Sequence, residues 1–154
     1  MELYLVQHGQ ALAKDTDPSR PLSEEGRTDV RRVASALGRN VSVERLLHSG
    51  KDRARQTAEI LMTMPGCAAA PEESAGLSPD DDVEPWAKRL AAEEKSTMLV
   101  GHLPFMGRLA SVLLGEDPTM EKVRFTPGTV LGLSRVHRGW RLELLVRPEQ
   151  LGGV

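Results

Sequence analysis

The sequence contains one cysteine, Cys67, and few aromatic residues: two tryptophans, two phenylalanines and one tyrosine among 154 residues. A single cysteine excludes an internal disulfide and any zinc site built from several cysteines. The aromatic residues are scattered along the chain, so they offer no stacking platform for single-stranded nucleic acid. The composition therefore favours an ordinary apolar core in a reducing compartment.

The chain also lacks an excess of charge of either sign. It has 20 Lys and Arg residues and 22 Asp and Glu residues, which give a formal net charge of −2. Without a basic surface, nucleic acid is not an expected partner. The apolar runs are short as well: the first, Leu3–Val6, falls far below the length of a signal core or a membrane-spanning helix. We expect a cytoplasmic protein that does not bind membranes.

Short apolar runs are what the sequence does contain, and they predict strands. A chain of this length can bury one core, so we expect a single domain over residues 1–154. Three runs bounded by Gly, Ser or Pro are typical of strands buried on both faces. Two further runs that flank a polar turn predict a β-hairpin. In chain order these segments are Leu3–Val6, Arg45–His48, Thr97–Gly101, Val130–Val136 and Trp140–Val146.

Helical patterns lie between these runs. After Ser23, a candidate N-cap, apolar residues recur at helical spacing up to Gly38, a typical C-terminal stop. Ser49-x-x-Asp52 resembles a capping box that opens a second helix. We expect a third helix from near Asp82, a surface loop over residues 65–82, and Pro104 in the first turn of a fourth helix. Strands that alternate with helices predict a three-layer α/β/α sandwich with a mostly parallel central sheet.

Three residues with useful chemistry follow three of the expected strands. His8 follows the first strand, Arg53 lies shortly after the second, and His102 follows Thr97–Gly101 directly. The carboxyl ends of parallel strands line the ligand crevice of α/β proteins, so these residues are expected to share a site. Two imidazoles and a guanidinium near a helix N-terminus suit a phosphate. A neutral histidine there can attack phosphorus and form a phosphohistidine intermediate.

The motifs around these residues resemble those of the histidine phosphatase (phosphoglycerate mutase-like) superfamily. The motifs are His8-Gly9, Ser49-x-x-x-Arg53-Ala54-x-Gln56-Thr57-Ala58 and Gly101-His102-Leu103-Pro104. The short chain and an early motif are similar, more narrowly, to SixA-type phosphohistidine phosphatases; that motif is Arg20-Pro21-Leu22-Ser23-Glu24-Glu25-Gly26. The resemblance implies a phosphoglycerate mutase-like fold and a metal-independent phosphatase that needs no cofactor.

The resemblance also implies roles for individual residues. His8 is expected to be the nucleophile, Arg53 the phosphate clamp, and His102 a second histidine that contacts the phosphoryl oxygens. Gly9 belongs to the same phosphate-binding loop, and Arg20 is a further candidate for phosphate or substrate contact. The implied substrate is a phosphohistidine on a protein such as a phosphotransfer domain, and the implied product is inorganic phosphate.

One position departs from the family pattern, which reads Arg-His-Gly where this chain reads Gln7-His8-Gly9. Glutamine can donate a hydrogen bond to a phosphoryl oxygen, but it lacks the charge and the bidentate fork of arginine. A hydrogen bond to a charged group contributes roughly 1.5–3 kcal/mol, so the change lowers phosphate affinity by about one to two factors of ten. An alternative function is therefore a phosphate- or phosphoprotein-binding module that has lost turnover.

Two further alternatives stay open. A small-molecule phosphomonoesterase is one, although the short chain leaves little room for an insertion that encloses such substrates. A zinc hydrolase is the other, because His8, His48 and His102 all lie near strand ends and three histidines can hold catalytic zinc. Strand alternation turns His48 away from the crevice, so we expect no metal site. No general acid is assigned among the acidic residues of the second loop and its end, which are Glu73, Asp80, Asp81, Asp82 and Glu84.

Overall fold

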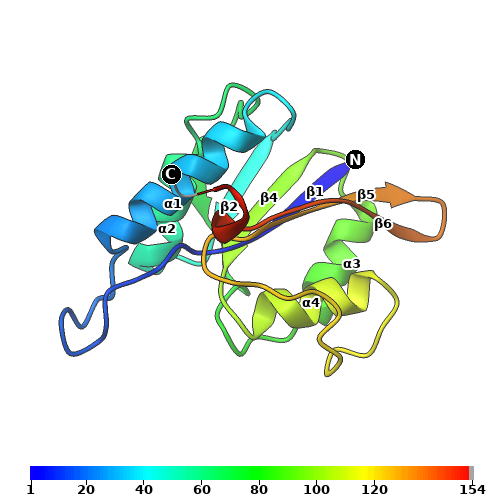
Figure 1. Cartoon of the computed structure of the whole chain (residues 1–154). Coiled ribbons are helices and arrows are strands. Elements are labelled where there is room, and N and C mark those ends of the chain that lie inside the picture. The colour runs from blue at the N-terminus through cyan, green and yellow to red at the C-terminus, as the bar shows by residue number, and fades with distance from the viewer. Residues whose placement is uncertain (153–154) are drawn as a thin grey trace.

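A six-stranded mixed sheet forms the centre of the molecule in a computed structural model that describes residues 1–152 (Figure 1). The strands are β1 (Glu2–Gln7), β2 (Arg45–His48), β3 (Pro71–Glu73), β4 (Thr97–Gly101), β5 (Val130–Val136) and β6 (Gly139–Val146). Their order in the sheet is β3-β2-β4-β1-β5-β6. The first four strands of that order pair in parallel, whereas β5 and β6 form antiparallel pairs. The prediction of a mostly parallel sheet closed by a hairpin is confirmed.

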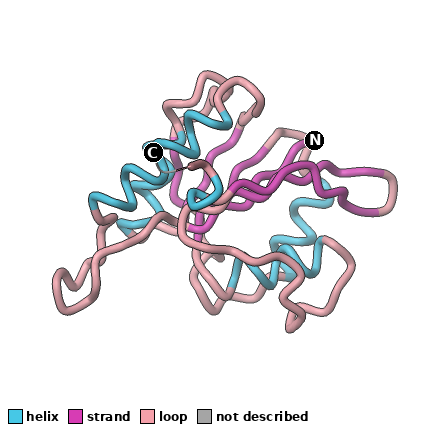
Figure 2. The backbone as a smooth tube through the Cα atoms, in the orientation of Figure 1, coloured by secondary structure: helices cyan, strands magenta, loops and turns pink. Residues whose placement is uncertain are grey.

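Helices cover both faces of this sheet. They are α1 (Glu24–Leu37), α2 (Asp52–Leu61), α3 (Glu84–Ala92) and α4 (Phe105–Leu113), followed by a short 3₁₀ turn, η1 (Pro148–Gln150), near the end of the described chain. Helices α1 and α2 lie on one face and α3 and α4 on the other, as the ribbon and the tube both show (Figures 1 and 2). The expected three-layer sandwich is therefore confirmed. In the part of the chain that the structure describes, no helix is both long and apolar enough to span a membrane.

Alternation along β1 divides the core into two layers. Leu3 and Leu5 are fully buried on the face of α3 and α4, in the same cluster as Phe105. Tyr4 and Val6 face α1 and α2 and belong to the second cluster. Each such side chain stabilises the fold by about 1.5–3 kcal/mol when fully buried. Burial on both faces explains why the run is continuously apolar, and it holds the strand rigidly up to the residue that precedes His8.

The ends of the helices agree only in part with the signals in the sequence. Ser23 caps α1 as expected, because its Oγ accepts the Gly26 N–H at 3.0 Å, and Gly38 ends the helix at φ +48°. The capping box at Ser49 is wrong: Lys51 is the N-cap of α2, and its side chain makes no capping hydrogen bond. Helix α3 begins at Glu84, near Asp82 as expected, but the loop expected over residues 65–82 contains β3. That strand is three residues long and lies at the sheet edge, with little apolar pattern to reveal it.

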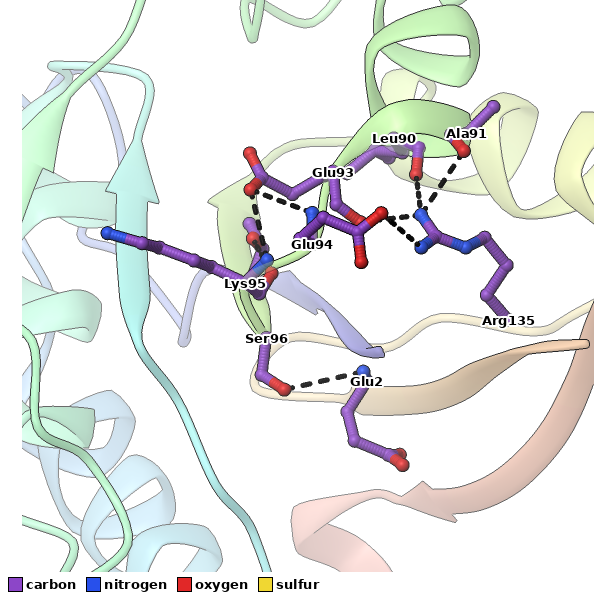
Figure 3. A network of polar contacts seen from close by, with 9 residues as sticks. Glu2, Leu90, Ala91, Glu93, Glu94, Lys95, Ser96 and Arg135 are labelled. Atoms are coloured by element: carbon purple, nitrogen blue, oxygen red, sulfur yellow. Dashed lines mark hydrogen bonds and ion pairs between the residues drawn. The ribbon is translucent and has the colours of Figure 1, made fainter.

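A network of hydrogen bonds joins β5 to the C-terminal end of α3. The Arg135 guanidinium, from β5, donates to the carbonyl oxygens of Leu90 and Ala91 at 3.0 and 3.2 Å (Figure 3). These carbonyls lie in the last turn of α3, at the helix C-terminus, where a cation is favourable. The contacts fix α3 far from the site described below, because they lie beside the start of β1 and the start of β4.

The parallel pairing decides where ligands can bind. Strands β1 and β2 both pair in parallel with β4, so the carboxyl ends of all three lie along one edge of the sheet. Gln7 is opposite Gly101 in this register, and His48 is opposite Val100. The residues that follow the three strands are therefore neighbours in space although they are distant in sequence.

Candidate active site

His8 lies directly after β1 and is held by its backbone on two sides. Its N–H donates to the Gly101 carbonyl at 2.9 Å, and its own carbonyl accepts the Gly128 N–H at 3.0 Å. The ring Nδ1 lies 2.6 Å from the Gly9 carbonyl oxygen. A carbonyl oxygen only accepts hydrogen bonds, so Nδ1 must carry the proton. In the neutral ring the lone pair is therefore on Nε2, which is the atom available to attack an electrophile.

His102 lies beside His8 at the end of β4. The two ring centroids are 5.0 Å apart and the rings are tilted by 54°. His102 is 2% exposed, and its Nε2 lies 2.6 Å from the Ser49 hydroxyl oxygen. Its Nδ1 is buried and has no hydrogen-bond partner among the described residues. The structure thus brings together the two histidines that the sequence placed at strand ends, and it adds Ser49.

Both histidines are neutral near pH 7. The pKa of His8 is lowered to about 4, chiefly by burial and also by the charges of Arg53 and Arg20, against the opposing effect of the hydrogen bond to Gly9. Burial also lowers the pKa of His102 to about 3, helped by His8 and then by nearby cations, which include Arg53. A neutral His8 keeps the Nε2 lone pair that a nucleophile needs.

The charges that act on the histidine pair are all positive. Arg53 lies in the first turn of α2, and its Nε is buried without a hydrogen-bond partner. Burial and the charge of Arg20 lower the pKa of the Arg53 guanidinium. Arg20 has φ +48°, and its Nε donates to the Leu12 carbonyl at 3.1 Å. Within residues 1–152, no ion pair neutralises Arg53, Arg20 or the neighbouring Lys51. Two neutral imidazoles among unpaired cations suit a phosphoryl dianion.

Thr57 joins the His8 loop to the helix that carries Arg53. The Gly9 N–H donates to Thr57 Oγ1 at 3.0 Å, and the same hydroxyl donates to the Arg53 carbonyl at 2.8 Å. Thr57 is fully buried. Gly9 also packs closely against α1, because a Cβ there would lie 2.7 Å from Val30 Cγ2. The sequence motif contained Thr57, but its role became visible only when the strand and the helix were placed together.

We expect Thr57→Val to lower kcat by about tenfold to a hundredfold, because a buried N–H without a partner costs about 1–3 kcal/mol and the His8 loop must shift to satisfy it. Thr57→Ser keeps the hydroxyl and is expected to stay within about threefold of wild type. Steady-state kcat and KM on an aryl phosphate, together with thermal unfolding, separate lost positioning from lost stability. Equal kcat values for the two variants would contradict the positioning role.

Gln7 lies at the end of β1 and is 8% exposed. Its backbone N–H donates to the Thr129 carbonyl at 3.1 Å, whereas its side-chain Oε1 is buried and has no hydrogen-bond partner among the described residues. By strand alternation the side chain lies on the face of Leu3 and Leu5. The position that holds arginine in the family pattern is thus occupied here by a buried, neutral side chain with one unused acceptor.

The three-histidine zinc site is not formed. In residues 1–152, no group of three or more His, Cys, Asp or Glu side chains is arranged to hold a metal ion. His48 is buried, and its Nδ1 accepts the Gly50 N–H at 3.1 Å. Burial lowers the pKa of this ring, against the nearby Glu73 carboxylate, which raises it. His48 is therefore a structural residue of the loop that carries Ser49.

Comparisons with known proteins agree with this geometry. The structure described as the protein histidine phosphatase SixA complexed with tungstate has a TM-score of 0.84 and 28% identity, with 99% of this chain and 100% of that chain covered. A provisionally named SixA phosphohistidine phosphatase from Agrobacterium tumefaciens has a TM-score of 0.77 and 25% identity, with 96% and 97% covered. The α-ribazole phosphatase of Shigella flexneri has a TM-score of 0.78 but 17% identity, with 96% and 97% covered, and it supports the fold alone.

The fold is thus that of the phosphoglycerate mutase-like α/β proteins. A family model described as the histidine phosphatase superfamily (branch 1) matches residues 3–78, which include His8 and Arg53. No protein with a curated description matches the sequence. The chain is thus similar to the histidine phosphatase superfamily, in sequence over residues 3–78 and in fold over nearly its whole length.

Proposed function

We propose that this protein is a phosphatase that hydrolyses phosphohistidine on a protein substrate, through a covalent phosphohistidine intermediate on His8. One observation carries the proposal: His8 has a free Nε2 lone pair and a lowered pKa, and it lies beside a second neutral histidine among unpaired cations. The 28% identity to the SixA structure supports the same class of substrate. The substrate protein would carry its phosphohistidine on an exposed surface, as a phosphotransfer domain does.

The proposed reaction has two displacements. Solvent protonates the substrate's phosphorylated ring on its free nitrogen, and the Nε2 lone pair of His8 attacks phosphorus in line. The P–N bond breaks, its electron pair stays on the ring, and a neutral imidazole leaves. Water then attacks the phosphorus on His8, which releases inorganic phosphate and restores the neutral ring. In both steps the Arg53 guanidinium and an N–H of His102 stabilise the equatorial phosphoryl oxygens, where the charge of a phosphoryl-transfer transition state is concentrated. Arg20 adds a further cation to the same phosphate site. The Gly9 backbone acts on His8 instead, because its N–H is bonded to Thr57 and its carbonyl orients the His8 ring.

The surroundings of the histidines favour a phosphoramidate over an alkyl phosphate. Cleavage of an alkyl phosphate expels an alkoxide and requires a general acid, whereas phosphohistidine expels an imidazole, whose pKa is about 6.5. The charged groups that shift the pKa values of His8 and His102 are cations, and no carboxylate is among them. A site of this kind binds the phosphoryl group well, and a substrate with a good leaving group depends least on a proton donor.

The decisive experiment measures inorganic phosphate released from three substrates: a phosphotransfer domain phosphorylated on histidine, an aryl phosphate and an alkyl phosphate. We expect kcat/KM to fall in that order. Incubation of the phosphorylated domain without enzyme corrects for spontaneous hydrolysis. An enzyme that prefers the alkyl phosphate would contradict the proposal. Phosphate binding without turnover of any substrate would instead favour a phosphoprotein-binding module, and Gln7 would be its cause.

Gln7 supplies a separate prediction. Gln7→Arg restores the charge that the family pattern has before the histidine, and its guanidinium can form charge-assisted hydrogen bonds to phosphate. We expect the inhibition constant of inorganic phosphate to decrease by roughly tenfold to a hundredfold. Gln7→Met, which is neutral and similar in size, is the matched control and should not tighten binding. An unchanged constant in Gln7→Arg would mean that charge at position 7 does not limit phosphate affinity.

The pH dependence of activity follows from the lowered pKa of His8. The reactive form is neutral His8, so kcat/KM is expected to fall only as the pH drops through about 4, rather than through the usual histidine range near 6.5. The measurement is the pH profile of kcat/KM on an aryl phosphate, corrected for titration of the substrate. An NMR titration of the ring protons should show neither His8 nor His102 titrating between about pH 5 and pH 8. A midpoint near 6.5 for either ring would contradict the burial argument.

A further inference from the structure

Two exposed apolar side chains lie on one groove beside the phosphate site. Among the described residues the large hydrophobic side chains that are exposed are Met62, Leu103, Met120 and Leu142. Leu103 and Met120, at 40% and 53% exposed, both line a groove of about 390 Å³ between the first turn of α4 and the segment that follows this helix. Figure 1 shows that segment returning beside α4 toward β5.

The groove has a firm floor and a fixed wall. Its floor is formed by Val123 and Phe125, which are each 6% exposed and belong to the core cluster under α4. The wall is attached to α4, because the Ser111 hydroxyl donates to the Met120 carbonyl. The groove is therefore present before any ligand binds, and a partner need not order this segment first.

The groove is adjacent to the candidate phosphate site. Leu103 follows His102 directly, and the His102 ring is 5.0 Å from that of His8. A free phosphate that reaches His8 would leave the groove uncovered. A phosphohistidine on a folded protein must bring neighbouring side chains against this surface. The groove contains one exposed cation, Arg108, and one exposed anion, Glu121, so these two charges balance. It therefore selects a partner by apolar contact rather than by net charge.

We propose that this groove is the docking site for an apolar side chain that lies next to the phosphohistidine on the protein substrate. The inference rests on the proposed function and deepens it, because it names the feature by which the enzyme distinguishes a protein substrate from a small phosphate. A leucine- or methionine-sized side chain seated between Leu103 and Met120 covers both exposed side chains. It holds the substrate protein while its phosphoryl group enters between His8 and Arg53.

The test uses Leu103→Asp and Met120→Asp, with Met62→Asp as the matched control. Met62 is also 40% exposed, but it follows the last residue of α2, at the end of the helix opposite Arg53. Each enzyme is assayed on a histidine-phosphorylated phosphotransfer domain and on an aryl phosphate. We expect the two groove variants to lose about tenfold or more in kcat/KM on the protein, mainly through KM. On the aryl phosphate Met120→Asp should stay within about twofold. Leu103→Asp places a carboxylate beside His102, so it is compared with the neutral Leu103→Asn, which should stay within about twofold on the aryl phosphate. Met62→Asp should match wild type on both substrates.

Other results would overturn the docking inference. An equal loss on both substrates would make the groove a structural support of the site and leave the phosphatase proposal intact. Groove variants that match Met62→Asp on the protein substrate would show that nothing docks there. A dimer in wild type that dissociates in both groove variants, without loss of kcat/KM on the protein, would assign the groove to a second copy of the chain. If the wild-type enzyme releases phosphate from the aryl phosphate alone, the proposed function itself fails, and the docking inference fails with it.

Discussion

His8→Ala is expected to lower kcat on a histidine-phosphorylated protein by about 10³-fold or more, the largest effect of any substitution considered. The physical reason is that alanine removes the atom placed to accept the phosphoryl group, the His8 Nε2, which the Nδ1 contact to Gly9 leaves free. His102 cannot substitute for it, because its Nε2 already contacts the Ser49 hydroxyl. Phosphate binding should be weakened far less than turnover, because Arg53 and the α2 N-terminus are unchanged.

The measurement combines steady-state rates with trapping of the intermediate. Rapid quenching of the wild-type enzyme in alkali should retain acid-labile phosphate on the protein, and His8→Ala should retain none. His137→Ala is the control, because His137 is exposed in the turn between β5 and β6 and lies outside the site. A His8→Ala enzyme that keeps turnover within about tenfold of wild type would exclude covalent catalysis by His8.

The sequence predicts those elements of the fold that depend on local patterns of residues. Apolar runs bounded by Gly, Ser or Pro identified β1, β2 and β4, and a capping serine and a terminal glycine identified α1. For parallel strands, the rule that ligands bind at the carboxyl ends predicts that His8 and His102 lie close together. The structure confirms this with ring centroids 5.0 Å apart.

The sequence was insufficient where a contact joins distant segments. Ser49 has the residue type and spacing of a helix cap, but its hydroxyl lies at His102, 53 positions further along the chain. Thr57 similarly joins a helix to Gly9, 48 positions earlier. Each of these hydroxyls forms a hydrogen bond with a residue that lies near it only in the folded protein. Local sequence preferences therefore do not predict the partner. Strand β3 was missed for a related reason, because its pairing with β2, and not its own composition, makes it a strand.

Arg53 gives the second large effect and the best internal control. We expect Arg53→Ala to lower kcat/KM on an aryl phosphate by about 10²–10³-fold, because it removes a preorganised cation from the phosphoryl oxygens. Arg53→Lys keeps the charge but loses the planar fork, so an intermediate loss is expected. Arg55 lies two residues further along α2, where its guanidinium is paired with Asp52 and Glu59 at the surface. Arg55→Ala should therefore stay within about twofold of wild type.

The same substitution tests the electrostatic reasoning independently of rate. Arg53 lowers the pKa values of both His8 and His102, so Arg53→Ala should move the two ring titrations upward, toward the usual histidine value. The acid limb of kcat/KM should then begin at a higher pH in the variant than in wild type, while Arg55→Ala leaves it unchanged. If activity fell without this upward shift, Arg53 would act on the substrate alone, and burial alone would keep the histidines neutral. If the shift occurred without loss of activity, Arg53 would be a neighbour of the histidines and not the phosphate clamp.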